Sequence, residues 1–365
     1  MKSKLSDICF YAKGKVNVSG LTNADYISTE NMLSNKGGIT TASSLPSTVH
    51  TQAYKKDDVL VSNIRPYFKK IWFADFDGGC SNDVLVFRAK EDTDARFLYY
   101  VLADDAFFDY STATSKGTKM PRGDKPAIMQ YEVPHFDLPI QKKIAGILAD
   151  LDNKIALNSN INKNLEEQAQ ALYKAWFVDF SAFGDTAPND WQTYHLVDFL
   201  PVITGKKNAN VSSNQGKYPF FSCSQDYAWT DGYSFDGYAI LVAGNGDFNV
   251  KFYSGKFEAY QRTYVLIPYE PKYTAWLFYA VQYHLSSITS AARGSVIKFI
   301  TKGNLEDFEF VAPKVPLSLP VIYTLDAINR KIAANREENL RLGTLRDTLL
   351  PKLMSGELDV SNIDL

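Results

Sequence analysis

Residues 144–162 read IAGILADLDNKIALNSNIN, and residues 321–339 read VIYTLDAINRKIAANREEN. In both stretches, selected residues recur at alternating steps of four and three, which is the spacing of a coiled-coil seam. The seam positions are Ile144, Leu148, Leu151, Ile155, Asn158, Asn162, Leu165, Ala169, Leu172 and Trp176 in the first helix, and Val321, Leu325, Ile328, Ile332, Asn335, Asn339, Leu342, Arg346, Leu349 and Leu353 in the second. Each position of the second seam lies 177 residues after its counterpart.

The two seams also share their polar residues. Asn158 and Asn162 return as Asn335 and Asn339. Asparagine on a seam lowers stability but specifies register, because a buried amide needs a partner. Two unrelated amphipathic helices, each packed on its own domain, would explain the leucines but not the shared asparagines. We therefore interpret the chain as an internal duplication.

The duplication suggests how the two helices pair. If they pack antiparallel, Asn158 faces Asn339 and Asn162 faces Asn335, and we predict both pairs to be hydrogen-bonded. The fold class predicted is α+β, with two mixed α/β segments separated by two long antiparallel coiled-coil helices in a pseudo-twofold internal repeat. A helix of about 40 residues is about 60 Å long, so the coil would hold the segments apart. Such a device suits the reading of two DNA half-sites, since equivalent faces of the duplex recur about every 34 Å.

Each long helix follows a segment that is richer in predicted strands than helices. In the first segment, 59–62, 71–73 and 84–87 read as strands, Asp77-Gly78-Gly79 as a break, and 96–110 as a helix. In the second, 239–242 and 263–267 read as strands, 274–284 as a helix, and Gly244-Asn245-Gly246 as a tight hairpin turn. Arg293-Gly294-Ser295 takes the place of Lys116-Gly117-Thr118. Pro351 should kink the second long helix.

Composition narrows the class of protein. The chain has 365 residues, 45% of them hydrophobic, and this length and composition favour two globular domains. Its net charge of −2 argues against a strong general affinity for nucleic acid. We expect a cytosolic protein, because no segment reads as a membrane span or signal peptide. The cysteines and histidines are too scattered to predict a disulfide framework or a metal site: Cys9, Cys80, Cys223, His50, His135, His195 and His284.

No catalytic motif stands out. The chain has no Pro-Pro dipeptide, which an Asn/Asp-Pro-Pro-aromatic methylase loop requires. Gly205-Lys206-Lys207 lacks the upstream glycine and the hydroxyl of an ATP-binding loop. Asp247 with Glu270-Pro271-Lys272 is a poor nuclease site, because proline would disrupt the strand that carries it. We therefore expect a non-enzymatic protein, without cofactor or metal in this chain.

Three segments resemble a known family, the specificity (S) subunits of type I restriction–modification systems. They are Leu138-Pro-Ile-Gln-Lys-Lys-Ile-Ala145, Ala171-Leu-Tyr-Lys-Ala-Trp-Phe-Val-Asp-Phe180 and Leu349-Leu-Pro-Lys-Leu-Met-Ser-Gly-Glu-Leu358. The resemblance covers the whole chain and implies five parts: a target-recognition domain at 1–138, a central helix at 139–182 that docks modification (M) subunits, a second target-recognition domain at 183–316, a helix at 317–354 that pairs with the central one, and a tail at 355–365. The second helix begins Leu319-Pro320-Val321 and lacks the Gln-Lys-Lys of the first.

The resemblance also implies function and partners. The chain would bind a bipartite target in double-stranded DNA and position two M subunits, which methylate adenine with S-adenosylmethionine. Restriction (R) subunits would add translocation and cleavage driven by ATP and Mg²⁺. The complex would act in the prokaryotic cytoplasm, without a membrane.

Candidate DNA-binding residues lie in two Gly-containing loops, where backbone can approach a phosphate, and in other basic clusters, one of them interleaved with Tyr67 and Phe68. They are Arg65, Lys69, Lys70, Lys116, Thr118, Lys119 and Arg122 in the first domain, and Lys206, Lys207, Arg262, Arg293, Ser295 and Lys298 in the second. Arginine reads guanine bidentately, so Arg122, Arg262 and Arg293 are the predicted base contacts. Any one of these lysines could instead belong to a solvated charged face.

Two other functions stay open on the sequence. The chain could be a non-enzymatic scaffold whose twin modules bind protein, or a self-sufficient nuclease or methylase, against which the missing motifs argue. Salt dependence separates the scaffold from the DNA-binding subunit, because DNA binding weakens steeply with salt as counterions are released.

Overall fold

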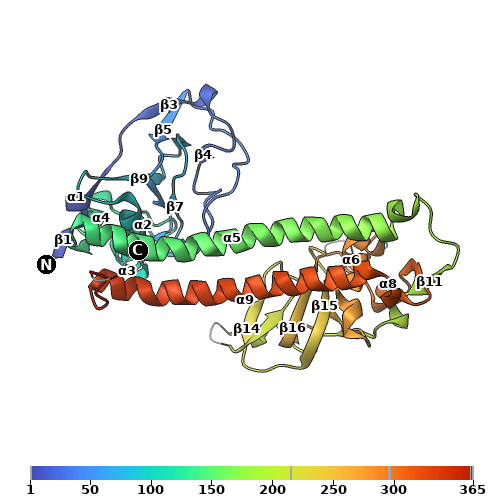
Figure 1. Cartoon of the computed structure of the whole chain (residues 1–365). Coiled ribbons are helices and arrows are strands. Elements are labelled where there is room, and N and C mark those ends of the chain that lie inside the picture. Colours follow the sequence, from blue (N-terminus) through green and yellow to red (C-terminus); the bar gives the residue numbers. More distant parts are fainter. Residues whose placement is uncertain (1, 214–215, 291, 295–296, 362, 364–365) are drawn as a thin grey trace. The chain divides into compact units, whose positions relative to one another are not determined.

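Two long helices carry the repeated seams. In the computed structural model, α5 runs over Leu138–Phe177 and α9 over Pro320–Ser355 (Figure 1). The structure describes residues 2–213, 216–290, 292–294, 297–361 and 363. Every seam position of both helices is buried or half-buried. The chain forms two compact units, Met1–Ile155 with Leu340–Leu365 (unit 1) and Ala156–Asn339 (unit 2). These differ from the predicted domains, because each unit contains part of both long helices.

The asparagines of the two seams pair as predicted, within unit 2. Asn158 Nδ2 donates a hydrogen bond to Asn339 Oδ1 at 2.9 Å, and Asn335 Nδ2 donates to Asn162 Oδ1 at 2.8 Å. Because the later residue of one helix meets the earlier residue of the other, α5 and α9 are antiparallel there. The predicted pairs are confirmed.

One seam position of α9 carries a charged residue, Arg346, whose partner lies in unit 1. The Arg346 guanidinium donates a 2.7 Å hydrogen bond to Asp152 Oδ1 on α5. The other carboxylate oxygen of Asp152 accepts a 2.7 Å hydrogen bond from the buried Tyr100 hydroxyl. Burial alone would lower the pKa of Arg346, but the bonds and charges of Asp152 and Asp347 raise it above its usual value. Arg346 therefore ties the two long helices to the globular part of unit 1.

The described globular part of unit 1 contains two four-stranded sheets. One has the order β2 (Cys9–Tyr11), β9 (Val84–Ala89), β6 (Val59–Ser62), β7 (Ile71–Phe73), and all its pairs are antiparallel. The other has the order β3 (Lys15–Asn17), β5 (His50–Tyr54), β8 (Gly78–Cys80), β4 (Tyr26–Ile27). A further antiparallel pair joins β1 (Lys2–Lys4) to β10 (Glu132–Pro134). The short helices are α1 (Leu5–Ile8), α2 (Ala95–Ala103), α3 (Asp105–Ala113) and α4 (Lys125–Ile128).

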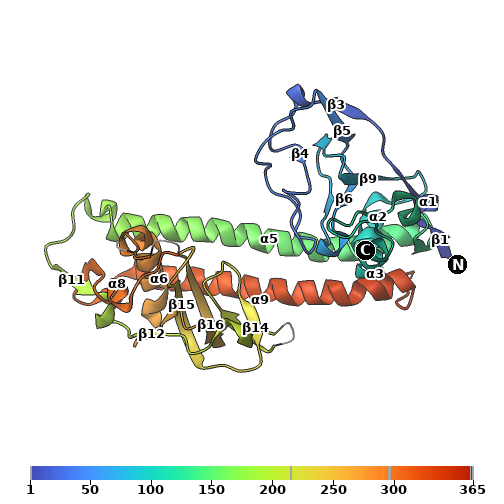
Figure 2. The same cartoon turned by 180° about the vertical axis from the view of Figure 1, so that it is seen from behind.

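The globular part of unit 2 repeats this plan with a larger sheet. Its six strands have the order β12 (Val202–Thr204), β17 (Thr263–Leu266), β15 (Phe235–Ala243), β16 (Val250–Ala259), β13 (Tyr218–Phe221), β14 (Ala228–Thr230). The first four correspond in order to β2-β9-β6-β7. The pair β11 (Trp191–His195) with β18 (Glu309–Pro313) corresponds to β1 with β10. The short helices are α6 (Thr274–Tyr283), α7 (Leu285–Ile288) and α8 (Lys302–Glu306). Figure 2 shows the same elements from behind.

The repeat extends to how the globular parts contact the long helices. In unit 2 the Tyr279 hydroxyl on α6 donates a 2.7 Å hydrogen bond to Asn329 Oδ1 on α9, as Tyr100 does to Asp152 in unit 1. Asn329 lies 177 residues after Asp152, and the position equivalent to Arg346 is Ala169 on α5. The charged pair of unit 1 is thus replaced by a neutral arrangement in unit 2.

Several local predictions are corrected. The helix expected over 96–110 is two helices, because Asp104 is extended and its carboxylate caps α3 by accepting from the Ala106 amide at 3.0 Å. Gly78 and Gly79 belong to β8 and are not a break. The Asn-Gly hairpin joins β15 to β16, but its turn is not tight, since the Ala243 amide bonds to the Asn249 carbonyl.

The C-terminal end of α9 stays helical through Pro351, because proline removes only one backbone hydrogen bond. The tail packs onto unit 1. Val360 is buried in the same cluster as Leu353 and Met354, and Lys143 Nζ donates to the Ser361 carbonyl at 2.7 Å. None of the helices in the described ranges is both long and apolar enough to cross a membrane.

Candidate nucleic-acid interface

Two loops at equivalent places in the repeat carry most of the predicted DNA contacts. We call residues 116–122 the first loop and residues 293–299 the second loop. The Lys116 amide donates to the Arg122 carbonyl at 2.8 Å, and the Arg122 amide donates to the Lys116 carbonyl at 2.9 Å. In the same way, the Arg293 amide donates to the Phe299 carbonyl at 2.9 Å, and the Phe299 amide donates to the Arg293 carbonyl at 2.8 Å. Both loops are therefore closed by a matching pair of hydrogen bonds.

Each loop is also joined to the end of a sheet strand. After β6, the Arg65 amide donates to Pro121 O at 2.8 Å and the Asn63 carbonyl accepts from the Gly123 amide at 3.1 Å. After β15, the Gly246 amide donates to the Lys298 carbonyl and the Gly244 carbonyl accepts from the Ile300 amide, both at 3.0 Å. In each loop, the residue after the first is a glycine with positive φ: φ is +95° at Gly117 and +108° at Gly294. The predicted equivalence of the loops is confirmed by their backbone.

Three of the six basic residues predicted in the first domain have acidic partners. Lys116 pairs with Asp124, and Arg122 with Asp83 at 3.1 Å. Lys69 and Lys36 share Asp105; burial would raise the pKa of that carboxyl, but the two lysines hold it below its usual value. Of the other predicted residues, Lys70 donates to Thr29 O at 2.6 Å, and Thr118 and Lys119 are exposed. Exposed ion pairs are weak, so a phosphate can replace such a carboxylate.

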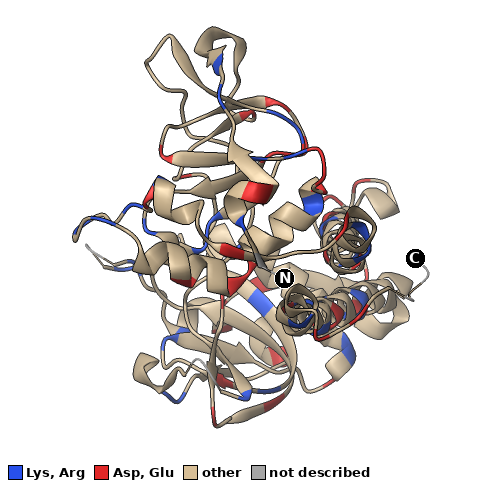
Figure 3. Ribbon diagram, turned by 90° about the vertical axis from the view of Figure 1, so that its left-hand side faces the viewer, with Lys and Arg blue, Asp and Glu red and all other residues tan. Residues whose placement is uncertain are grey.

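In the second domain, most of the predicted basic residues have no acidic partner within the described ranges. Lys207, Arg262, Arg293 and Lys298 are exposed, and within the described ranges their side chains make no hydrogen bond or ion pair. Lys206 lies over the Phe235 ring, with Nζ 5.4 Å from its centroid. Ser295 was also predicted to contact DNA and lies outside the described residues. Figure 3 shows acidic and basic residues interspersed along the ribbon, so any DNA contact depends on local loops.

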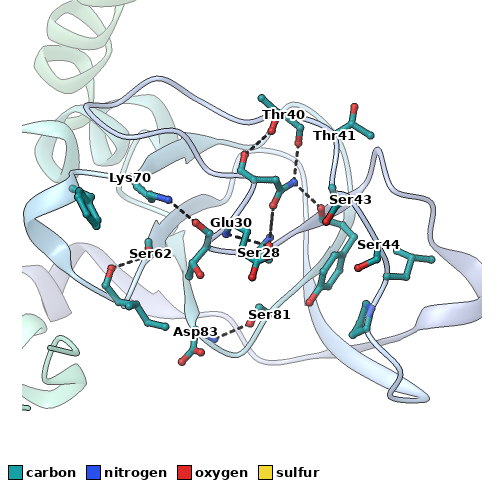
Figure 4. Close-up of a pocket in the computed structure, with 18 of the residues that line it drawn as sticks. Ser28, Glu30, Thr40, Thr41, Ser43, Ser44, Ser62, Lys70, Ser81 and Asp83 are labelled. Carbon is teal, nitrogen blue, oxygen red and sulfur yellow. Dashed lines mark hydrogen bonds between the residues drawn. The ribbon is translucent and has the colours of Figure 1, made fainter. Parts of the chain in front are cut away.

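Arg65 stands out among the predicted residues by its conformation. Its φ is +49°, a left-handed backbone that is costly for a residue other than glycine, and its Nε is buried without an acceptor in the described part of the chain. Arg65 lines a polar pocket in unit 1 together with Met120 of the first loop. Residues 28–31 and 40–46 form much of the remaining wall, and Ser62, Lys70, Ser81 and Asp83 also line the pocket (Figure 4). These lining residues were missed in the sequence, because two short Ser/Thr-rich stretches without basic residues have no distinguishing pattern.

Two residues of the Gln-Lys-Lys segment act inside unit 1. Gln141 is buried, accepts from the Asp94 amide at 2.9 Å and donates to the Phe136 carbonyl at 2.9 Å. Lys143 holds the C-terminal tail, as described above. Only Lys142 is exposed among the three. The segment therefore fastens the start of α5 to its own domain.

Nothing in the described ranges forms a metal site: no group of three or more His, Cys, Asp or Glu side chains is arranged to hold an ion. Burial raises the pKa of the Cys9 and Cys80 thiols to about 12, so neither is a reactive nucleophile at neutral pH.

The repeated domains, the paired helices and the matching loops define a fold that is also found in a solved structure. The S subunit of a type I restriction–modification system from M. genitalium superposes with a TM-score of 0.65 over 97% of this chain and 96% of its own, at 16% sequence identity. The family model for the type I restriction modification DNA specificity domain matches residues 1–167 and 188–336. The chain belongs to this family.

Curated relatives agree with that assignment. The chain is 35% identical over 175 residues to the specificity subunit of the Escherichia coli type I restriction enzyme EcoDI, covering 47% of this chain and 39% of that protein. It is 23% identical over 312 residues to the MjaIX specificity subunit of Methanocaldococcus jannaschii, covering 75% and 71%. The match to EcoDI thus spans less than half of that subunit. The family and the relatives are those of a specificity subunit and not of an enzyme.

Proposed function

We propose that this chain is the DNA-recognition subunit of a type I restriction–modification complex. Each domain would read one half of a bipartite target, and the chain would position two M subunits, which methylate adenine with S-adenosylmethionine, and R subunits, which use ATP and Mg²⁺. The complex would work in the prokaryotic cytoplasm. The observation that carries the proposal is the pair of equivalent loops, each closed by a matching pair of hydrogen bonds and joined to the end of the corresponding strand, β6 in the first domain and β15 in the second.

The proposal also follows from the chemistry of the loops. A positive-φ glycine beside a basic residue lets backbone and cation approach a phosphate together. Exposed arginines supply donors for guanine in the major groove. Duplicated loops on duplicated domains are suited to two separate half-sites and not to one continuous site.

The test is a genome-wide map of methylated adenine in the host with and without this gene. We expect one bipartite motif, two short half-sites with a fixed unspecified gap, to lose methylation when the gene is deleted. An unchanged map in a host whose M subunit is active would contradict the proposal.

Arg293 offers a sharper prediction at the level of one half-site. Its exposed side chain has no partner in the described structure, so Arg293→Ala should fold normally. We expect a loss of about 1–3 kcal/mol in binding of the complete complex, with relaxed specificity in one half-site only. Binding measured on a panel of single-base target variants checks this. Equal weakening on every sequence would instead make Arg293 a phosphate contact.

A further inference from the structure

The polar pocket of unit 1 has the character of a binding site. Its volume is about 830 Å³, and it is lined by residues 28–31 and 40–46, the strand ends near Ser62 and Asp83, and the turn that contains Arg65. Figure 4 shows Ser43 and Ser44 on one side and Ser62 on the other, with Ser28 and Glu30 between them. The lining includes Met120, so the pocket is continuous with the first loop.

One wall of the pocket is rigidly built. Asn31 is only 5% exposed. Its Nδ2 donates to the carbonyls of Tyr26 and Thr40, at 3.0 and 2.8 Å, and its Oδ1 accepts from the Ser28 amide at 2.6 Å. A buried amide that is saturated in this way fixes the segment on which Glu30 lies, so the pocket is preorganised.

Other polar groups of the pocket are left without partners. The Glu30 carboxylate and the hydroxyls of Thr41, Ser43 and Ser44 are exposed and form no hydrogen bond in the part of the chain that the structure describes. Arg65 has the buried, unpaired Nε and the left-handed backbone noted above. Glu30 and Arg65 also form no ion pair with each other, although both line the pocket. The Glu30 carboxylate is therefore available to a ligand as an acceptor and the three hydroxyls as donors, and no group of the described chain pairs with the Arg65 guanidinium.

We propose that this pocket reads one G·C base pair in the half-site bound by the first domain. Arg65 would donate to guanine O6 and N7, and Glu30 would accept from the cytosine N4 amino group. The major-groove edge of a G·C pair offers two acceptors on guanine and one donor on cytosine, which is the complement of one guanidinium and one carboxylate. The inference rests on the proposed function and deepens it by assigning a base pair to named side chains.

Charge argues against a phosphate as the ligand of this pocket. Glu30 places in its wall a carboxylate that has no ion-pair partner among the described residues, and this charge repels an anionic backbone. Lys70, the other cation of the lining, is already engaged with the Thr29 carbonyl at 2.6 Å. The base edge, which presents neutral donors and acceptors, fits this mixture of groups better.

The experiment is a methylation map of hosts that carry the complete complex with Glu30→Gln or Arg65→Lys. Glutamine keeps the shape of Glu30 but replaces an acceptor-only group with an amide, and lysine keeps the charge of Arg65 but loses its bidentate fork. We expect both variants to lower discrimination at the same base pair by at least about fivefold. That pair should lie in the half-site that Arg293→Ala leaves unchanged. Glu91→Gln, an exposed position of the same domain outside the pocket lining, serves as the matched control and should leave the motif unchanged.

Three outcomes would overturn the inference. The Glu30→Gln motif could be identical to the natural one, methylation could fall equally at all sequences, or the two variants could affect different base pairs. If the natural complex yields no bipartite motif at all, the proposed function fails as well. A bipartite motif that is insensitive to Glu30 overturns the pocket alone.

Discussion

Gly294→Ala should abolish recognition of one half-site, and with it methylation of the whole bipartite target. A Cβ built on Gly294 would lie 2.2 Å from the Ile297 carbonyl oxygen, and φ is +108°. The loop cannot relieve the clash by moving a side chain, because the obstructing atom is backbone. We expect a cost of about 2–4 kcal/mol for the bound loop geometry, measured as binding of target DNA by the complete complex.

The equivalent glycine of the first domain is the natural control. Gly117 has φ +95°, but its nearest obstacle, the Met120 carbonyl oxygen, is 3.5 Å from the added Cβ. Gly117→Ala should therefore carry only the backbone strain, about 1–2 kcal/mol, and retain measurable methylation. Equal losses in the two variants would show that the close approach in the second loop does not govern binding.

Asp152→Ala should destabilise unit 1 by about 2–4 kcal/mol, because it removes the carboxylate shared by Tyr100 and Arg346. The buried Tyr100 hydroxyl loses its acceptor, and the half-buried guanidinium keeps only Asp347. The measurement is the free energy of urea unfolding of the full chain, monitored with a spectroscopic probe that reports on unit 1.

Two controls separate this network from a general effect on the helix. Asp150 is exposed on the same helix, and Asp150→Ala should change stability by less than about 0.5 kcal/mol. Asn329→Ala removes the corresponding neutral partner of Tyr279 in unit 2 and should cost about 1–2 kcal/mol. A loss for Asp152→Ala no larger than that for Asn329→Ala would mean that the ion pair adds no stability.

The two halves of the repeat differ in charge at one pair of equivalent positions. Unit 1 has the ion pair of Asp152 and Arg346, whereas the equivalent positions of unit 2 hold the neutral residues Asn329 and Ala169. If two copies of the first half were paired, Asp152 would face Ala169 and its half-buried charge would have no partner. The pairing of α5 with α9 supplies Arg346 instead. The charged seam position, which departs from the apolar pattern, therefore favours the pairing of unlike halves.

Much of the helical framework is predictable from residues close together in the sequence. A four–three spacing determines which side of a helix is apolar, and the asparagines, which need each other, determine the antiparallel register. Asp104 is a clear failure of this approach: it lies within a helical pattern, yet its side chain caps a new helix, a choice that local periodicity does not reveal.

The candidate interface could likewise be predicted only in part from the sequence. The equivalence of Lys116-Gly117 and Arg293-Gly294 followed from their constant separation of 177 residues. The acidic partners of Lys69, Lys116 and Arg122 did not, because only the folded chain brings distant carboxylates to them.

By itself, the sequence determined the duplication, the two long helices, their asparagine pairs and the positions of the two loops, since each depends on periodic spacing or on a repeat that can be read along one chain. Only the tertiary structure decided that Glu30 and Arg65 line one pocket and that Arg346 meets Asp152. Those residues are brought together by sheet and helix packing, and no local pattern in the chain specifies which side chains such packing leaves without partners.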